Sequence, residues 1–136
     1  MGNTTLNLPN IRSYLLSQST VTDITDTRIF ISSPQSVNGI YIVMEIIADE
    51  RDNMVERSTI VEFRFMAHNN QTTLQSLINL KDAVTNLWCP ENENDLVQPT
   101  SLSWQTVNRV IEWSNLSIQN DNNGGPYIIK DYIFYY

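Results

Sequence analysis

Apolar and polar residues alternate through the middle of the chain in a pattern that predicts two long β-strands. From Ile40 to Ala48, β-branched and aromatic residues favour a strand and occupy both of its faces. One side carries Ile40, Ile42, Met44 and Ile46, and the other carries Tyr41, Val43 and Ile47 beside Glu45. We therefore expect this strand to be covered on both sides, or to present one side to a partner.

The segment STIVEFRFMAH, residues 58–68, predicts the second strand. It alternates so that one set of residues is expected to face the core, namely Val61, Phe63, Phe65 and Ala67, and another to face outward, namely Glu62, Arg64 and His68. Between the two strands lies the charged segment DERDNMVE, residues 49–56. The strands are therefore predicted to form a long antiparallel hairpin with a polar tip.

Two helices are predicted from apolar residues at helical spacing. The first has Asn7 as its cap and Pro9 in its first turn, and it runs to about Gln18 with Leu8, Ile11 and Leu15 on one face. The second opens at Asn69 or Asn70 and ends before Pro90, with apolar residues at Leu74, Leu77, Ile78, Val84, Leu87 and Trp88. The segment STVTDITD, residues 19–26, suits one more short helical turn.

Further strands are predicted at Arg28–Ile31, at 102–118 and at Tyr127–Tyr136. The second of these is expected to be bulged, because its apolar residues change phase between Trp113 and Leu116. Together the elements predict one domain, residues 1–136, of the α+β class: an antiparallel sheet of about four to five strands with a long hairpin, packed against two α-helices. Its predicted core contains Phe63, Phe65, Leu77, Val84 and Trp88.

The charge balance argues against nucleic-acid binding. The 136 residues include 8 Lys and Arg against 15 Asp and Glu, for a net charge of -7, and the basic residues are scattered singly. The longest apolar stretch, residues 39–48, is too short for a membrane helix and contains Glu45. The lone Cys89 cannot form an internal disulfide, and the first ten residues lack the features of a signal peptide, so we expect a cytoplasmic protein.

No set of residues predicts catalysis, a metal site or a cofactor. His68 is the only histidine and has no recognisable partner nucleophile, and Cys89 at a helix end is expected to be an inert thiol. The acidic loop with Glu91, Glu93 and Asp95 lacks the glycine and the terminal glutamate of a calcium loop. We therefore expect a protein that is not an enzyme.

Two segments are candidates for a subunit or tube interface. The first is the hairpin tip, with Asp49, Glu50, Arg51, Asp52 and Glu56. The second is the aromatic C-terminus, with Tyr132, Phe134 and Tyr136 on one face of the last strand.

The first half of the chain, IRSYLLSQSTVTDITDTRIFISSPQSVNGIYIVMEII, carries an ordered set of features. A helix leads to the strand Arg28-Ile29-Phe30, a loop with Pro34-Gln35, and an apolar strand with Tyr41-Ile42-Val43. In this order, and in the continuation VEFRFMAHNN followed by the helix LQSLINLKDAVTNLW and an aromatic last strand, the chain resembles the tail-terminator and tail-completion (head-tail joining) proteins of long-tailed bacteriophages. The resemblance covers nearly the whole chain.

The resemblance implies a structural virion protein of the tail or neck, assembled in the cytoplasm of a bacterial host. It implies a ring, hexameric in that family, that caps the tail tube at its head-proximal end. Its partners would be other copies of itself, the major tail tube protein and the head-tail connector or stopper, with DNA only passing through the channel. The alternatives are another neck or stopper-type protein, an acidic inhibitor that mimics DNA, and a small enzyme.

Overall fold

The structure, a computed structural model, describes residues 7–32, 34, 37, 39–50, 58–67, 74–88, 109–113, 117–120 and 126–135. Helix α1 spans Leu8–Leu16 and α2 spans Ser19–Thr25. The predicted apolar face of α1 is confirmed, because Leu8, Ile11 and Leu15 are its buried residues. Asn7 occupies the N-cap position in an extended conformation, but its side chain makes no capping hydrogen bond.

The predicted long hairpin is confirmed. Strand β2, Ile40–Glu50, pairs antiparallel with β3, Ser58–Ala67. Ile42 opposes Phe65 and Met44 opposes Phe63, so these side chains share the face that enters the core. The register shifts between Ile46 and Ala48, which leaves Ile47 as an extra residue in β2.

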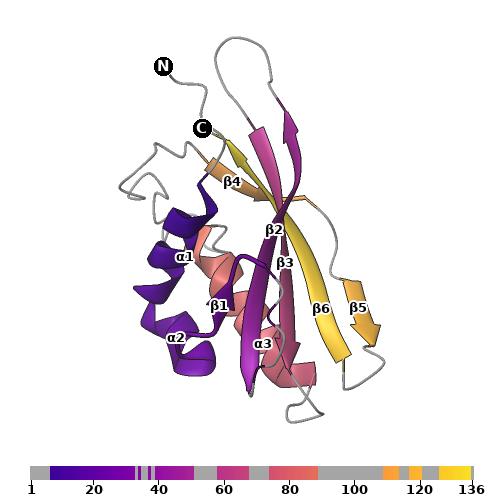
Figure 1. The fold of residues 1–136 in the computed structure, drawn as a ribbon. Coiled ribbons are helices and arrows are strands. Elements are labelled where there is room, and N and C mark those ends of the chain that lie inside the picture. Colours follow the sequence, from indigo (N-terminus) through magenta and orange to yellow (C-terminus); the bar gives the residue numbers. More distant parts are fainter. Residues whose placement is uncertain are drawn as a thin grey trace.

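The sheet is mixed, and in the described part of the chain it has six strands in the order β1-β2-β3-β6-β4, with β5 also paired to β6 (Figure 1). Strand β1, Ile29–Phe30, runs parallel to β2, and β6, Pro126–Tyr135, runs antiparallel to β3. The α+β class is confirmed. The sequence predicted only antiparallel pairing, which is wrong for β1, because the loop between β1 and β2 returns the chain in the same direction.

Strands β4, Arg109–Glu112, and β5, Ser117–Asn120, pair with the same edge of β6. Glu112 opposes Tyr132 and Ser117 opposes Ile129, so β4 and β5 advance five positions while β6 advances three. The chain between β4 and β5 therefore has two residues more than the matching part of β6. They lie at the point where the apolar pattern changes phase. The predicted bulge is an interruption that divides one predicted strand into two.

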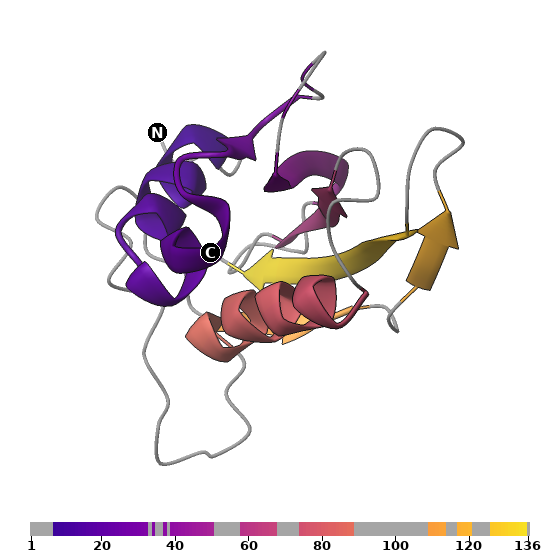
Figure 2. The same cartoon turned by 90° about the horizontal axis from the view of Figure 1, so that it is seen from below.

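Helix α3, Leu74–Trp88, packs with α1 and α2 on one side of the curved sheet (Figure 2). Its Trp88 ring meets Phe63, Tyr132 and Phe134 at centroid distances of 5.8, 5.6 and 5.3 Å. All five predicted core residues are buried: Phe63, Phe65, Leu77, Val84 and Trp88. No helix in the described ranges is long and apolar enough to cross a membrane.

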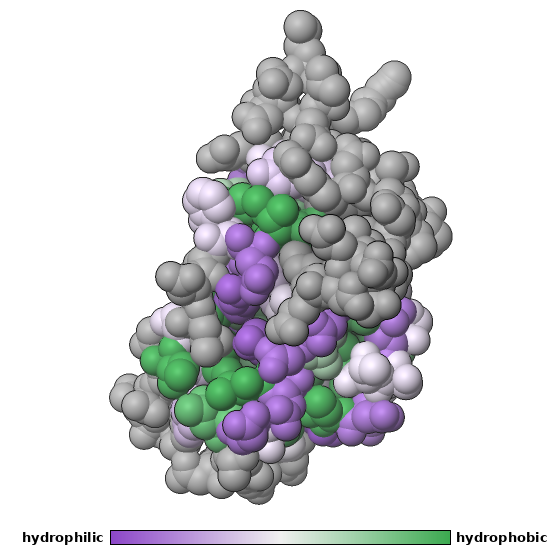
Figure 3. Space-filling model, turned by 180° about the vertical axis from the view of Figure 1, so that it is seen from behind, coloured by the Kyte–Doolittle hydropathy of each residue, from purple (hydrophilic) through white to green (hydrophobic). Residues whose placement is uncertain are grey.

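The side that carries α3 is polar on its outside. Figure 3 shows a band of hydrophilic residues running down this side, with smaller hydrophobic areas on both sides of the band. This is the amphipathic pattern expected of a helix whose apolar stripe is already used against a sheet.

Candidate functional site

The prediction that the aromatic residues of the last strand form an interface is wrong for Tyr132 and Phe134, two of its three residues. Tyr132 and Phe134 are fully buried in the core of their own chain, where Trp88 of α3 covers both rings. They are therefore unavailable to a neighbouring subunit. Tyr136 lies outside the described residues.

The predicted hairpin tip is described only at its base. The Asp49 side chain is exposed, and its Oδ1 accepts a hydrogen bond of 2.9 Å from the Thr59 hydroxyl across the hairpin. Glu50 is the last residue of β2. Arg51, Asp52 and Glu56 lie outside the described residues, so the proposed role of the tip stays a prediction.

The face of the sheet opposite the helices carries a row of carboxylates. Glu45 of β2 opposes Glu62 of β3, which in turn opposes Asp131 of β6. Arg64 lies beside this row, with its Nη2 atom 2.8 Å from Glu45 Oε1 and its Nε atom 3.3 Å from Glu62 Oε2. Like charges directly opposite each other destabilise a sheet, and the contacts of Arg64 with Glu45 and Glu62 reduce the repulsion between these two carboxylates.

The titration of Glu62 reflects this environment. Partial burial raises the pKa of Glu62 above its ordinary value, and Asp131 and Glu45 add to the rise while Arg64 opposes it. The face also contains apolar side chains: Val43 and Ile133 are buried there although they do not belong to the core cluster beneath the helices. It is therefore a mixed surface with an acidic centre.

Exposed apolar side chains gather at one border of the sheet. In the described part of the chain the exposed large hydrophobic residues are Ile47 (47%), Ile111 (38%), Trp113 (57%) and Ile118 (49%). Three of these four lie on or directly after β4 and β5. We call the border formed by residues 109–113 and 117–120 the β4–β5 edge.

This edge was not predicted from the sequence. The segment RVIEW, residues 109–113, places apolar residues on both faces of its strand, since Val110 is buried whereas Ile111 and Trp113 are exposed. Apolar residues on both faces of the strand are a signal that the sequence contains, but they point to an exposed edge only once the pairing places the strand at the border of the sheet.

The opposite border of the sheet, at β1, is closed by side chains of the same chain. Arg12 of α1 donates through Nε to the Ile29 carbonyl oxygen at 2.6 Å. Arg28 donates through Nε to the Ile40 carbonyl at 3.0 Å, and Gly39, at φ 97°, leaves room for its guanidinium. The Arg28-Ile29-Phe30 segment, singled out in the sequence, thus fixes β1 against β2, where Phe30 also meets Tyr41 edge-on at 6.1 Å.

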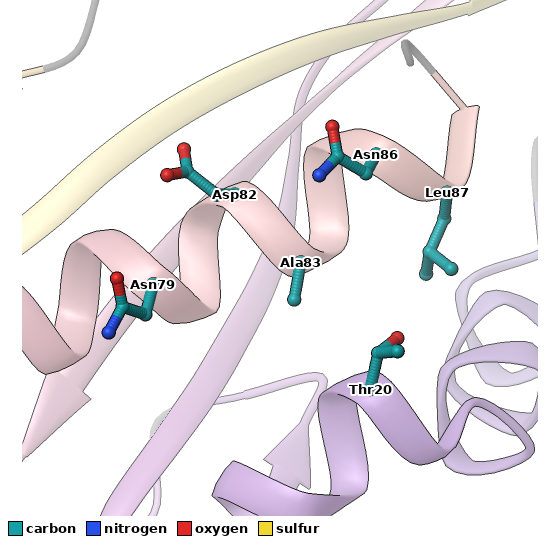
Figure 4. Close-up of a pocket in the computed structure, with 6 residues that line it drawn as sticks. All are labelled: Thr20, Asn79, Asp82, Ala83, Asn86 and Leu87. Carbon is teal, nitrogen blue, oxygen red and sulfur yellow. The ribbon is translucent and has the colours of Figure 1, made fainter. Parts of the chain in front are cut away.

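A hollow of about 440 Å³ lies between α2 and α3, lined by Thr20, Asn79, Asp82, Ala83, Asn86 and Leu87. Figure 4 shows that Ala83 and Leu87 point toward Thr20 while the polar ends of the other three residues do not converge. Asp82 is paired with its neighbour Lys81 at 2.5 Å. This arrangement brings no base next to a nucleophile.

The remaining candidate chemistry lies outside the described residues: His68, Cys89, Glu91, Glu93 and Asp95. Within the ranges that the structure describes, no group of three or more His, Cys, Asp or Glu side chains could hold a metal ion. The surface with the most distinctive character in these ranges is therefore the apolar β4–β5 edge beside the acidic face.

Comparison with known proteins does not identify a family. The sequence matches no protein-family model, and no curated protein matches it.

Proposed function

We propose that this chain is a ring-forming tail terminator of a long-tailed bacteriophage, which caps the tail tube and offers a surface to the head connector. The observation that carries the proposal is the gathering of Ile111, Trp113 and Ile118 on one edge of an α+β domain. Exposed apolar clusters of this kind are typical of surfaces that bind protein partners. The kind of assembly, a ring that caps the tail tube, is inferred from the order of sequence features, which resembles that of the tail-terminator proteins.

The layout of the surfaces favours a ring over a two-fold dimer. A ring needs head-to-tail contacts, so each subunit must present two different complementary surfaces. This domain has helices on one side of its sheet, an acidic face on the other, and two borders of unlike character, because Arg12 closes β1 while the β4–β5 edge exposes apolar side chains.

The acidic character of the chain suits a channel for DNA. Its net charge is -7, and the row of Glu45, Glu62 and Asp131 adds a local concentration of negative charge. Negative protein surfaces repel the phosphate backbone, so DNA would pass such a ring without being retained. In the proposed role the chain acts with its tube and connector partners and not through catalysis.

The experiment is to disrupt the gene in the phage that encodes the chain and to image the lysate by negative-stain electron microscopy. Loss of a terminator should give tail tubes of abnormal length that do not join heads, and the intact gene supplied in trans should restore normal particles. Tails of normal length beside unjoined heads would instead assign the chain to a stopper or other neck position. Normal particles from the disrupted phage would exclude both roles.

A further inference from the structure

A single row of four side chains crosses the face of the sheet opposite the helices. Glu45 of β2 opposes Glu62 of β3, which opposes Asp131 of β6. The row continues at Trp113, directly after β4, whose backbone N–H donates to the Asp131 carbonyl oxygen at 3.0 Å. Residues directly opposite each other in paired strands share a face of the sheet, so the row of three carboxylates ends at an indole. We call these four residues the acidic-aromatic row.

The row is partly exposed and has apolar neighbours. The Glu45 side chain is 55% exposed, and Trp113 is 57% exposed. Two positions further along, strands β3, β6 and β4 place an apolar row beside it, formed by Ile60, Ile133 and Ile111. Ile111, at the end of this second row, is 38% exposed. Exposed apolar side chains that border polar ones are typical of surfaces that bind proteins.

The charges on this face do not balance. The strand register places four acidic and two basic residues on it, a formal balance of -2. The acidic residues are Glu45, Glu50, Glu62 and Asp131, and the basic residues are Arg64 and Arg109. Burial raises the pKa of Glu62, and the charges of Asp131 and Glu45 raise it further, although Arg64 lowers it. A positive charge from outside the chain would relieve the repulsion within the row.

This combination of groups indicates the chemistry of a partner. A metal ion does not fit, since no group of three or more His, Cys, Asp or Glu side chains in the described ranges could hold one. The carboxylates would repel DNA, and they would also repel a second copy of a chain whose net charge is -7. A cationic side chain, in contrast, pairs with carboxylates and also packs on the face of an exposed indole.

We infer that the acidic-aromatic row docks a segment of another protein that carries arginine or lysine next to apolar residues. Its cationic side chains lie over Glu45, Glu62 and the Trp113 indole, and its apolar side chains cover Ile111. Trp113 supplies the largest exposed apolar contact, as aromatic residues commonly do in protein interfaces. The inference goes beyond the proposed ring, because it holds for any assembly of the chain. In the ring, a partner on this face covers the row, and passing DNA meets the remaining charge of the chain.

The test is a titration of the purified full-length chain into a labelled short peptide of alternating arginine and leucine, followed by fluorescence anisotropy. A peptide of alternating glutamate and leucine is the charge-reversed probe. The arginine peptide should bind and the glutamate peptide should not. Trp113→Ser should weaken binding by about 10-fold, since it removes an aromatic anchor. Glu45→Gln should weaken it by about 3-fold, as expected for an exposed ion pair.

Each variant has a matched control elsewhere on the chain. Ile118→Ser removes a side chain that is 49% exposed but opposes Ile128 of the core, so it lies on the helix side of the sheet. Asp82→Asn removes a carboxylate on α3 whose side chain is 53% exposed, close to the exposure of Glu45. Both controls should leave the affinity for the arginine peptide unchanged. Circular dichroism should match in all four variants, because the substituted side chains are exposed.

Three outcomes would overturn the inference. The first is no binding of the arginine peptide up to about 1 mM, where a contact of this size should be measurable. The second is equal binding of the two peptides, which would show that the charges of the row play no part. The third is an equal loss in the variants and their controls, which would show a general effect of charge and apolar surface. Tail length in the disrupted phage tests the proposed function separately.

Discussion

The hydroxyl oxygens of Thr85 and Tyr132 lie 2.5 Å apart inside the core and tie helix α3 to strand β6. Either hydroxyl can donate. Both groups are buried, and the hydrogen bond gives the Thr85 hydroxyl a partner beside the Tyr132 ring, which packs against Phe63 and Trp88. It therefore links helix α3 to strand β6 in addition to their apolar packing.

The first prediction follows from this pair. Tyr132→Phe should lower the free energy of unfolding by about 1 kcal/mol, and Thr85→Val by a similar amount, since each removes the hydrogen bond between the two hydroxyls. The double variant should lose less than the sum, which urea denaturation of all four proteins would measure as a coupling energy. Strict additivity would mean that the two hydroxyls do not interact in solution.

The second prediction concerns the core face of the hairpin. Phe65 is fully buried and opposes Ile42 and Ile128 on its two neighbouring strands. Phe65→Ala should therefore lower the free energy of unfolding by about 3 to 5 kcal/mol, because it leaves a cavity beneath α3. Ile47→Ala, at an exposed position of the same hairpin, should change stability by no more than about 0.5 kcal/mol. Equal effects of the two substitutions would show that the strand faces are assigned the wrong way round.

How far the sequence predicts this fold depends on how many faces of each element are apolar. Strand β3 and helix α3 have one apolar face each, and the core residues predicted on them are buried, although the buried Leu80 and Thr85 of α3 were not predicted. Strand β6 is apolar on both faces, with Tyr132 and Phe134 on one and Ile133 and Tyr135 on the other. Periodicity alone could not tell which face the helix covers. The interface was consequently assigned to the two rings that Trp88 buries.

The β4–β5 edge escaped prediction for a related reason. The phase change between Trp113 and Leu116 indicated a bulge, and two extra residues are present there. The sequence does not reveal, however, that this divided strand forms a border of the sheet. That follows only from pairing across long sequence separations, such as Ile111 with Ile133. Exposure of Ile111 and Trp113 is a consequence of the topology and not of local pattern.

The third prediction tests the closed border at β1. Gly39 has φ 97°, and a Cβ atom there would lie 2.9 Å from Nη2 of Arg28. Gly39→Ala should therefore lower the free energy of unfolding by about 1 to 3 kcal/mol, the range expected for a strained backbone position. Asn tolerates positive φ better than Ala does. Thermal melting of Gly39→Asn thus separates the causes, because a loss as large as that of Ala would identify contact with Arg28 as the main one.

The fourth prediction is a pH dependence. Burial raises the pKa of Glu62 above the ordinary value of 4.5, so the folded chain holds this proton more tightly than the unfolded chain does. The contribution of Glu62 to stability is consequently lost as the pH rises from about 4.5 through the raised pKa. Relative to Glu62→Gln, the unchanged protein should become less stable across this window. Denaturation at several pH values measures the difference in the free energy of unfolding between the unchanged protein and Glu62→Gln, and Asp23→Asn on α2 is the charge-matched control. A difference that stays constant across this pH range would contradict the prediction.

The last prediction concerns the hairpin tip, whose base is at Glu50 and Ser58. Charges at an exposed tip contribute little to folding but strongly affect how two charged surfaces meet. The triple variant Asp49→Lys/Glu50→Lys/Asp52→Lys should therefore stay folded, losing only about 1 kcal/mol through the hydrogen bond between Asp49 and Thr59. Thr59→Val, which removes that hydrogen bond without altering charge, is the control.

If the tip docks onto the tail tube or the head connector, the triple variant should form rings of normal mass yet give tails of abnormal length or unjoined heads in electron micrographs. Normal infectious particles would remove the tip from these contacts, and the carboxylate row of Glu45, Glu62 and Asp131 would then be the better candidate for the surface that meets tube or connector.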